Sequence, residues 1–154
     1  MTIPGYPVFG THTKYLAGKV LPIPLTAENG FLPNMKDVDG TIRAFNGKGS
    51  GRVKAVCFNY PNNPTGAGAT LEFFQDASDL AHEHNLVVVH DAAYAALDFG
   101  GRKPTGILQA AGGLECGIQI HSMSKAFNMI GRRIAFAAGN PKLIAAYALS
   151  LIHI

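Results

Sequence analysis

Three short segments of this chain gather side chains that can do chemistry, and each follows a stretch typical of a buried strand. They are NYPNNPTG at residues 59–66, DAAY at residues 91–94, and SMSK at residues 122–125, with Arg133 eight residues after the lysine of the last segment. Parallel strands bring their carboxyl ends to one edge of a sheet, and ligands bind there. We therefore expect an amide, a carboxylate, a phenol, hydroxyls, an amine and a guanidinium to converge on one rim.

Together these groups meet the needs of a phosphorylated nitrogen heterocycle that carries a carbonyl. The Lys125 amine attacks a carbonyl only when deprotonated, which nearby cations and restricted solvent favour. A carboxylate such as Asp91 at the end of a buried strand can hold a proton on a ring nitrogen. The hydroxyls of Ser122 and Ser124 and the planar fork of Arg133 suit a phosphate. The set predicts pyridoxal 5′-phosphate (PLP) as the cofactor.

Each of these residues also has a purely structural interpretation. Asp91 could cap a helix or bind a metal, and Asn, Pro and Gly of the first segment are typical turn residues. Ser122 and Ser124 could satisfy backbone groups, and a lone lysine after such a turn is commonly a solvated surface residue. The occurrence of all three segments in this order favours the cofactor interpretation.

The elements expected to position these groups alternate between helices and strands. Apolar spacing predicts helices over Pro7–Ala17, Met35–Phe45, Leu71–His84 (with Thr70 as N-cap) and from Pro141 onward. Extended segments are predicted over Lys19–Leu25, Val53–Phe58, Leu86–His90, Gly117–His121 and Ile134–Ala138. This alternation predicts an α/β fold of three layers, in which a mostly parallel sheet has helices on both faces.

Composition narrows the class of protein. A chain of 154 residues that is 47% hydrophobic and 15% charged can bury a core and is not disordered. The net charge of +3 is spread without a basic run, so no nucleic-acid partner is expected. The apolar stretch Leu143–Ile154 is shorter than the roughly 20 residues that span a bilayer, so no membrane partner is expected. Cys57 and Cys116 predict two buried, reduced thiols in a cytoplasmic protein.

Metal and nucleotide sites find little support in the sequence. The six histidines form no CxxC or HExxH pattern, so no metal is expected, and His90 and His121 are interpreted as packing or supporting residues. A dinucleotide fingerprint beginning at Gly66 would need glycine where Leu71 stands, and Gly49 follows Lys48 where a Walker loop needs Ser or Thr. A nucleotide-binding α/β module without PLP is therefore a disfavoured alternative.

The ordered segments PNNPTG, DAAY and SMSK resemble those of the fold-type I, PLP-dependent aminotransferases of classes I and II. From PGYPVF through ENGFLP, NYPNNPTGA, HDAAY and IHSMSKAFNMIG, the chain is similar to the LL-diaminopimelate aminotransferase branch over roughly residues 3–147. The resemblance implies a partial PLP-binding large domain at residues 1–148, followed by a tail at 149–154 that does not continue the family pattern. It also implies amino-group transfer from an amino acid, foremost LL-2,6-diaminopimelate, to 2-oxoglutarate in lysine biosynthesis. The alternative is an alanine- or aspartate-type transaminase.

The resemblance assigns roles to individual residues. Lys125 would form the Schiff base with PLP and move the substrate's proton, and Asp91 would pair with the ring nitrogen. Tyr94 and Asn63 would hydrogen-bond the ring's phenolate oxygen. Ser122, Ser124 and Arg133 would hold the phosphate. Tyr6 and Ala93 would contact the two ring faces, although an aromatic residue beside Pro near a terminus is more often a packing residue.

The sequence also departs from the family pattern. Arg132 stands where relatives commonly carry Trp, although Arg133 keeps its spacing. The family's chains are more than twice as long, and three of their parts have no counterpart here: a glycine-rich phosphate loop, a tyrosine lent across the homodimer, and an arginine that grips the substrate's α-carboxylate. We therefore expect the middle segment of a homodimeric enzyme, inactive as the 154-residue chain alone.

Overall fold

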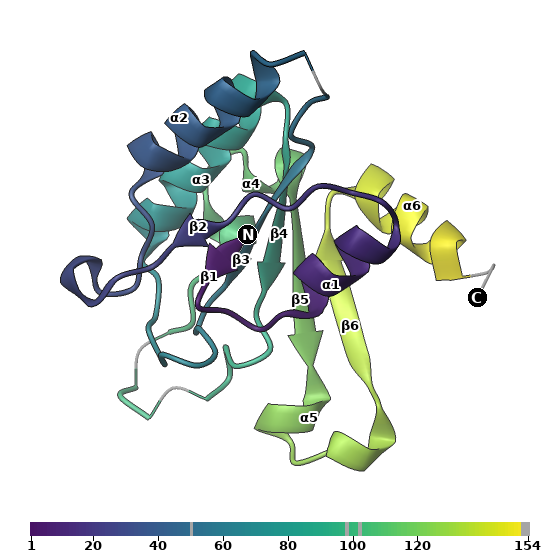
Figure 1. Ribbon diagram of the computed structural model, residues 1–154. Coiled ribbons are helices and arrows are strands. Elements are labelled where there is room, and N and C mark those ends of the chain that lie inside the picture. The colour runs from purple at the N-terminus through teal and green to yellow at the C-terminus, as the bar shows by residue number, and fades with distance from the viewer. Residues whose placement is uncertain (50, 98, 102, 152–154) are drawn as a thin grey trace.

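The computed structural model describes residues 1–49, 51–97, 99–101 and 103–151 (Figure 1). Its helices are α1 (Val8–Tyr15), α2 (Met35–Asn46), α3 (Leu71–His84), α4 (Gly113–Cys116), α5 (Met123–Ala126) and α6 (Pro141–Leu151). Its strands are β1 (Thr2–Ile3), β2 (Ile23–Pro24), β3 (Ala55–Asn59), β4 (Val87–Asp91), β5 (Gly117–Ser122) and β6 (Ala135–Gly139). Short 3₁₀ turns are η1 (Ala27–Asn29), η2 (Ile107–Gln109) and η3 (Ile130–Arg132). The predicted alternation of helices and strands is confirmed.

The larger sheet has the order β3-β4-β5-β6, with the first three strands parallel and β6 antiparallel to β5. Asn59 pairs with Asp91, and Asp91 pairs with Ile120, so the three parallel strands end side by side. Ser122 pairs with Ala135, which places the start of β6 at the same end. The parallel strands β1 and β2 form a second sheet, and β1 lies beside β3. The carboxyl ends of β3, β4 and β5 thus form one rim, at the bottom in Figure 1.

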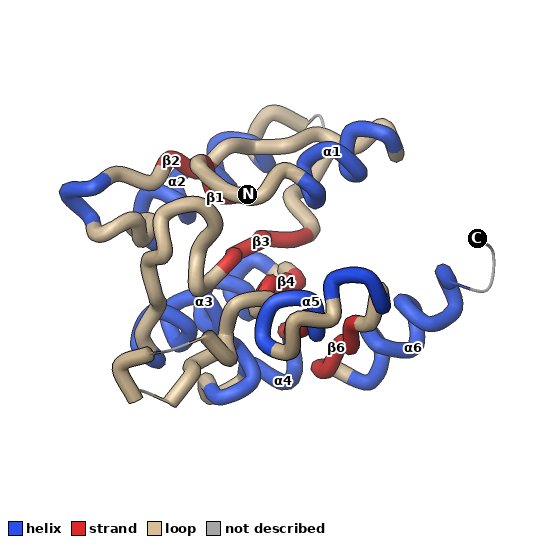
Figure 2. The backbone as a smooth tube through the Cα atoms, turned by 90° about the horizontal axis from the view of Figure 1, so that it is seen from below, coloured by secondary structure: helices blue, strands red, loops and turns tan. Residues whose placement is uncertain are grey.

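Helices cover both faces of the larger sheet, as predicted. Figure 2 shows the sheet from below, with α2, α3 and α4 on one side of the strands and α1 and α6 on the other. Helix α3 packs against α2, α4 and β4, and α6 packs against β6. The expected three-layer α/β architecture is confirmed.

Helix α3 anchors the core beside the rim. The Thr70 hydroxyl accepts a hydrogen bond from the Phe73 backbone N–H at 3.2 Å, which confirms the predicted N-cap. Phe74 is completely buried, and burial of such a side chain contributes about 1.5–3 kcal/mol. The core around it includes Val38, Ile42, Val56, Phe58, Ala77, Ala81, Val88 and Ile107.

Several predicted details differ in the structure. Only Ile23 and Pro24 of the extended segment Lys19–Leu25 form a strand, because two of its residues are prolines and its single partner, β1, is two residues long. Helix α1 ends at Tyr15, two residues before the predicted end at Ala17, and Ala17 itself is left-handed, at φ 58°. Cys116 is buried as predicted, but Cys57 is only half-buried, and both are free thiols.

Tail residues 149–151 continue α6, whereas 152–154 lie outside the described residues. The longest described helix, α3, has 14 residues, and no described helix has the length and apolar character needed to cross a membrane.

Candidate active site

The turn after β3 is built around Asn62. The Asn62 carbonyl accepts a hydrogen bond from the Gly66 N–H at 2.8 Å, and its side-chain oxygen accepts one from the Thr65 hydroxyl at 2.8 Å. Gly66 has φ +74°, a conformation that glycine adopts without strain. The closed turn directs Asn63 towards the neighbouring strand end, where the Asn63 amide nitrogen lies 3.4 Å from the Tyr94 hydroxyl oxygen.

Asp91 ends β4 in the middle of the rim. The Asp91 side chain accepts a hydrogen bond from the Ala93 N–H at 3.1 Å, which places Ala93 directly beside the carboxyl group. Burial raises the pKa of Asp91, and the hydrogen bond from Ala93 opposes this shift. A carboxylate that is desolvated in this way is stabilised by a cation such as a protonated ring nitrogen.

Lys125 approaches the same place from β5. The Ser122 hydroxyl accepts a hydrogen bond from the Ser124 N–H at 3.2 Å and thereby caps the short helix α5, which carries Lys125. The Lys125 ammonium nitrogen lies 5.6 Å from the centroid of the Tyr94 ring. Asn63, Tyr94 and Lys125 are therefore brought together, next to Asp91. Ser122 in addition has the backbone role that the sequence left open.

Arg133 lies at the same rim, two residues before β6. Its backbone is left-handed, with φ 54° and ψ 43°, and its guanidinium donates to the Ile130 carbonyl at 3.2 Å. The pairing of Ala135 with Ser122 places this segment beside the two serines. Long side chains are uncommon at such φ values.

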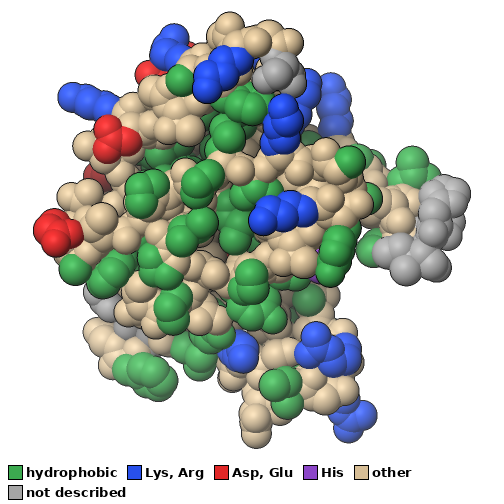
Figure 3. Space-filling view, in the orientation of Figure 1, with side chains coloured by type: hydrophobic (Ala, Val, Ile, Leu, Met, Phe, Trp, Pro, Cys, Tyr) green, Lys and Arg blue, Asp and Glu red, His purple; other side chains and the backbone are tan. Residues whose placement is uncertain are grey.

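Positive charge is concentrated on this part of the rim. Residues 117–139 contain three cationic side chains and no Asp or Glu, the cations being Lys125, Arg132 and Arg133. Figure 3 shows blue basic side chains on the lobe of α5 and η3 that projects at the bottom. This charge, together with the hydroxyls, is suited to a phosphate.

Tyr6 follows β1 and lies at the edge of the rim. It lines a shallow depression between β1 and β3 together with Phe9, Cys57 and Asn59, and 54% of its surface is exposed. An exposed ring at this edge is free to contact a ligand, so both the ring-stacking and the packing interpretations of Tyr6 stay predictions.

Asn59 and His90 support the site through contacts that the sequence did not predict. The Asn59 side chain contacts both Asp91 and Asn63, whereas an asparagine at a strand end resembles any turn residue in the sequence. His90 is completely buried; its Nε2 lies 2.9 Å from the Tyr60 carbonyl and its ring lies 4.5 Å from that of Phe74. The packing role predicted for His90 is confirmed, and burial lowers the pKa of His90 to about 4.

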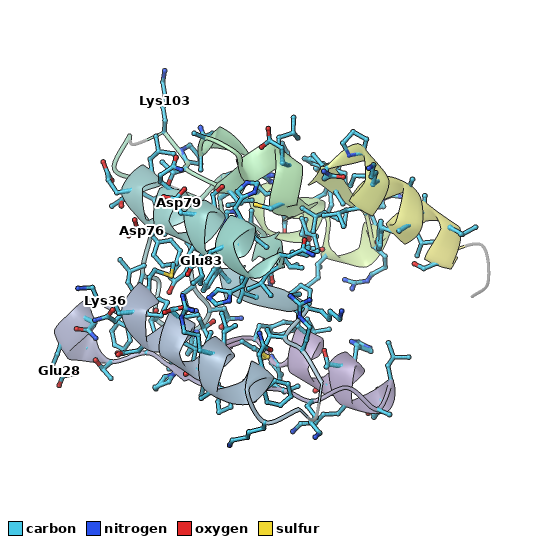
Figure 4. The ribbon with its side chains drawn as sticks, turned by 90° about the horizontal axis from the view of Figure 1, so that it is seen from above. Glu28, Lys36, Asp76, Asp79, Glu83 and Lys103 are labelled. Atoms are coloured by element: carbon cyan, nitrogen blue, oxygen red, sulfur yellow. The ribbon has the colours of Figure 1, made fainter. Side chains whose placement is uncertain are left out.

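A second cluster of ionisable groups lies away from the rim, between α2 and α3. The ligand atoms of Asp39, Glu83 and His84 lie within 4.8 Å of one another, a grouping that the sequence did not predict. Arg43 forms ion pairs with Asp39, at 2.8 Å, and with Glu83. Figure 4 labels Glu83 between α3 and α2. His84 Nε2 lies 2.5 Å from Asp39. Because the guanidinium already contacts both carboxylates, the cluster is an ion-pair link between helices.

Known proteins are similar to this chain in sequence and in structure. The family profile described as aminotransferase class I and II matches residues 1–150. The LL-diaminopimelate aminotransferase of Methanocaldococcus jannaschii is 47% identical over 148 residues, covering 96% of this chain and 34% of that protein. The chain therefore spans about a third of the length of this relative.

Solved structures agree with the sequence comparison. Substrate-bound BacF from Bacillus subtilis superimposes with a TM-score of 0.89 at 37% identity, covering 99% of this chain and 37% of that one. A double mutant of Thermus thermophilus aspartate aminotransferase gives a TM-score of 0.82 at 29% identity, covering 97% of this chain and 36% of that one. The chain belongs to the class I and II aminotransferases, a PLP-dependent family.

Proposed function

We propose that this chain carries the cofactor-binding rim of an LL-diaminopimelate aminotransferase. The observation that carries the proposal is the convergence of Asn63, Tyr94 and Lys125 beside Asp91. The amino donor, LL-diaminopimelate, is inferred from the names of relatives that are 47% and 45% identical to the chain. The reaction would be ping-pong transfer of an amino group between LL-2,6-diaminopimelate and 2-oxoglutarate, in a cytoplasmic homodimer.

The side chains at the rim fit PLP in their chemistry and in their positions. When bound, PLP supplies an electron-withdrawing ring that stabilises negative charge at the substrate's Cα. Asp91 would hold the proton on the ring nitrogen, since a cation beside this desolvated carboxylate favours its charged form. Asn63 and Tyr94 would donate hydrogen bonds to the ring oxygen. The Lys125 amine would hold the cofactor and then carry a proton to or from the substrate's Cα.

The phosphate would lie on the lobe of α5 and η3, which carries Lys125, Arg132 and Arg133. Ser122, Ser124 and Arg133 supply hydroxyl and guanidinium donors there, and residues 117–139 present no acidic side chain to repel an anion. Ala93, beside Asp91, would contact one ring face, and Tyr6 would contact the other.

Reductive labelling tests the cofactor and the lysine. The purified chain is incubated with PLP, reduced with borohydride and mapped by peptide mass spectrometry. We expect a phosphopyridoxyl group on Lys125 alone. The Lys125→Ala variant should lose it, whereas Lys142→Ala, which removes an exposed lysine on α6, should retain it. Scattered labelling of several lysines in a chain with native circular dichroism would overturn the proposal.

A chimera tests the donor. Residues of this chain replace the matching 148-residue segment of the M. jannaschii relative, and amino donors are compared with the unmodified relative. We expect LL-diaminopimelate to remain the preferred donor, with activity lost in the Lys125→Ala chimera. A switch of preference to alanine or aspartate would contradict the assignment and favour the alternative transaminase class.

A further inference from the structure

One side chain joins the two strand ends that frame the proposed site. The Asn59 side-chain nitrogen donates to the Asp91 carbonyl at 3.1 Å, and its side-chain oxygen accepts from the Asn63 backbone N–H at 2.8 Å. Asn59 is only 7% exposed, so water does not readily replace either bond. A single amide thus spans from the strand that ends in Asp91 to the turn that carries Asn63.

The backbone alone does not fix this geometry. Asn59 and Asp91 are the last paired residues of β3 and β4, and one further bond, from the Tyr60 N–H to the Asp91 carbonyl, measures 3.2 Å. Beyond this point one chain turns to Asn63 and the other to Tyr94. The contact between those two side chains, at 3.4 Å, is longer than an ordinary hydrogen bond and holds them weakly.

We propose that Asn59 is a positioning residue that sets where Asn63 and Tyr94 lie relative to Asp91. This inference rests on the proposed PLP site, in which Asn63 and Tyr94 contact the ring oxygen and Asp91 contacts the ring nitrogen. The role requires a side chain that donates on one side and accepts on the other. An amide does both, an ionised aspartate only accepts, and leucine does neither.

Three variants separate this role from general effects on folding. Asn59→Leu removes both bonds with nearly the same shape, and Asn59→Asp retains the acceptor for Asn63 but loses the donor to Asp91. The matched control is Asn62→Asp. Asn62 is also buried in this turn, and its side-chain nitrogen has no hydrogen-bond partner among the described residues, while its oxygen still accepts from Thr65. This control introduces the same charge and leaves both Asn59 hydrogen bonds, to Asp91 and to Asn63, in place.

The first readout needs no cofactor. Amide hydrogen exchange, followed by NMR and expressed as a protection factor, reports the bond from the Asn63 N–H. We expect protection at Asn63 to fall at least about tenfold in Asn59→Leu and to persist in Asn59→Asp and Asn62→Asp, since the bond from the Asn63 N–H to side chain 59 is removed only in Asn59→Leu. Unchanged protection in Asn59→Leu would overturn the proposal.

The second readout follows the bound cofactor. Hydrogen bonds to a deprotonated oxygen favour that form. The absorbance of bound PLP changes with pH, and Asn59→Leu should therefore raise the apparent pKa of that change by about half a unit or more. The same variant should weaken PLP binding about tenfold. Asn62→Asp provides the correction for added charge in Asn59→Asp. A variant Asn59→Leu that melts earlier but keeps this pKa would show a merely structural role and contradict the proposal.

The two proposals fail in different ways. If the wild-type chain acquires no cofactor absorbance, the proposed function fails, and the positioning role towards PLP fails with it. The exchange measurements still decide whether Asn59 fixes the turn. If the wild-type chain binds PLP normally and Asn59→Leu does so too, only the inference about Asn59 is wrong.

Discussion

At the scale of single residues, burial disfavours the charged form of the Asp91 carboxyl, whereas the proposed chemistry requires it. Burial raises its pKa, and the hydrogen bond from the Ala93 N–H opposes this shift. A raised folded-state pKa means that stability falls as pH rises from the unfolded-state value towards the folded-state value, and stays lower above it. At neutral pH the carboxylate therefore destabilises the cofactor-free chain, whereas a protonated ring nitrogen would compensate it.

The Asp91→Asn variant separates these two effects. We expect its cofactor-free melting temperature at pH 7 to be equal to or higher than that of the wild type, because the desolvated charge is gone. Its affinity for PLP should fall at least about tenfold, or about 1.4 kcal/mol. Thermal scans with and without PLP measure both, and Asp76→Asn, on the exposed face of α3, is the control. A lower melting temperature combined with unchanged binding would contradict this account.

His90 predicts how the fold responds to acid. Its pKa is about 4 because the ring is buried, against an ordinary value of about 6.5. Between pH 6.5 and pH 4, His90 is protonated in the unfolded chain but neutral in the folded chain. The contribution of neutral His90 to stability is therefore complete above pH 6.5 and is lost as pH falls towards 4. The difference between these two pKa values corresponds to about 3 kcal/mol of unfolding free energy.

Denaturant unfolding between pH 7 and pH 4 measures this loss. The His90→Gln variant keeps a donor for the Tyr60 carbonyl but does not titrate, so we expect a flatter dependence of the unfolding free energy on pH. His12→Gln, on the exposed face of α1, is the matched control and should follow the wild type. An equally steep dependence in His90→Gln would show that another group binds the proton.

At the scale of elements, the cap of α3 is the feature most open to a direct test. Thr70→Ala removes the acceptor for the Phe73 N–H at the start of the helix that packs the core. We expect a loss of about 1 kcal/mol in unfolding free energy, measured by urea denaturation. Thr70→Ser retains a hydroxyl and should lose much less. Equal losses in the two variants would assign the effect to the methyl group rather than the cap.

The elements that the sequence predicted well are those with a repeated pattern. The apolar run of β4 and the helical spacing of α3 extend over enough residues to define an element by themselves. Strand β1 has two residues and depends on its pairing with β2, while α5 has four and depends on the Ser122 cap, so neither has a period to detect.

The same distinction applies to the site. Convergence of Asp91 and Lys125 on one rim follows from parallel strand order, which the alternation of elements predicts. The double contact of Asn59 does not follow, because it depends on the register between β3 and β4. The cluster of Asp39, Glu83 and His84 is equally hidden, since it forms only where α2 meets α3.

At the scale of the whole molecule, the lobe formed by residues 123–136 is covered on few sides. Five of its large apolar side chains are between 41% and 60% exposed, namely Phe127, Met129, Ile130, Ile134 and Phe136. Exposed apolar patches favour association. In the M. jannaschii relative, about two thirds of the chain lies outside the matched segment, so that protein has further residues available to cover a surface of this kind.

We therefore expect the 154-residue chain to associate as its concentration rises, so that light scattering gives masses above 16.3 kDa. The double variant Ile130→Thr, Ile134→Thr removes two exposed apolar side chains from the lobe and should shift the onset of association to higher concentration. Leu16→Thr is the control, because Leu16 is 85% exposed but lies at the end of α1, outside the lobe. If Leu16→Thr suppresses association as strongly as the double variant, general surface hydrophobicity rather than this lobe drives it. A wild-type chain that stays monomeric at every concentration would show that the exposed lobe is too small, or too cationic, to bring two copies together.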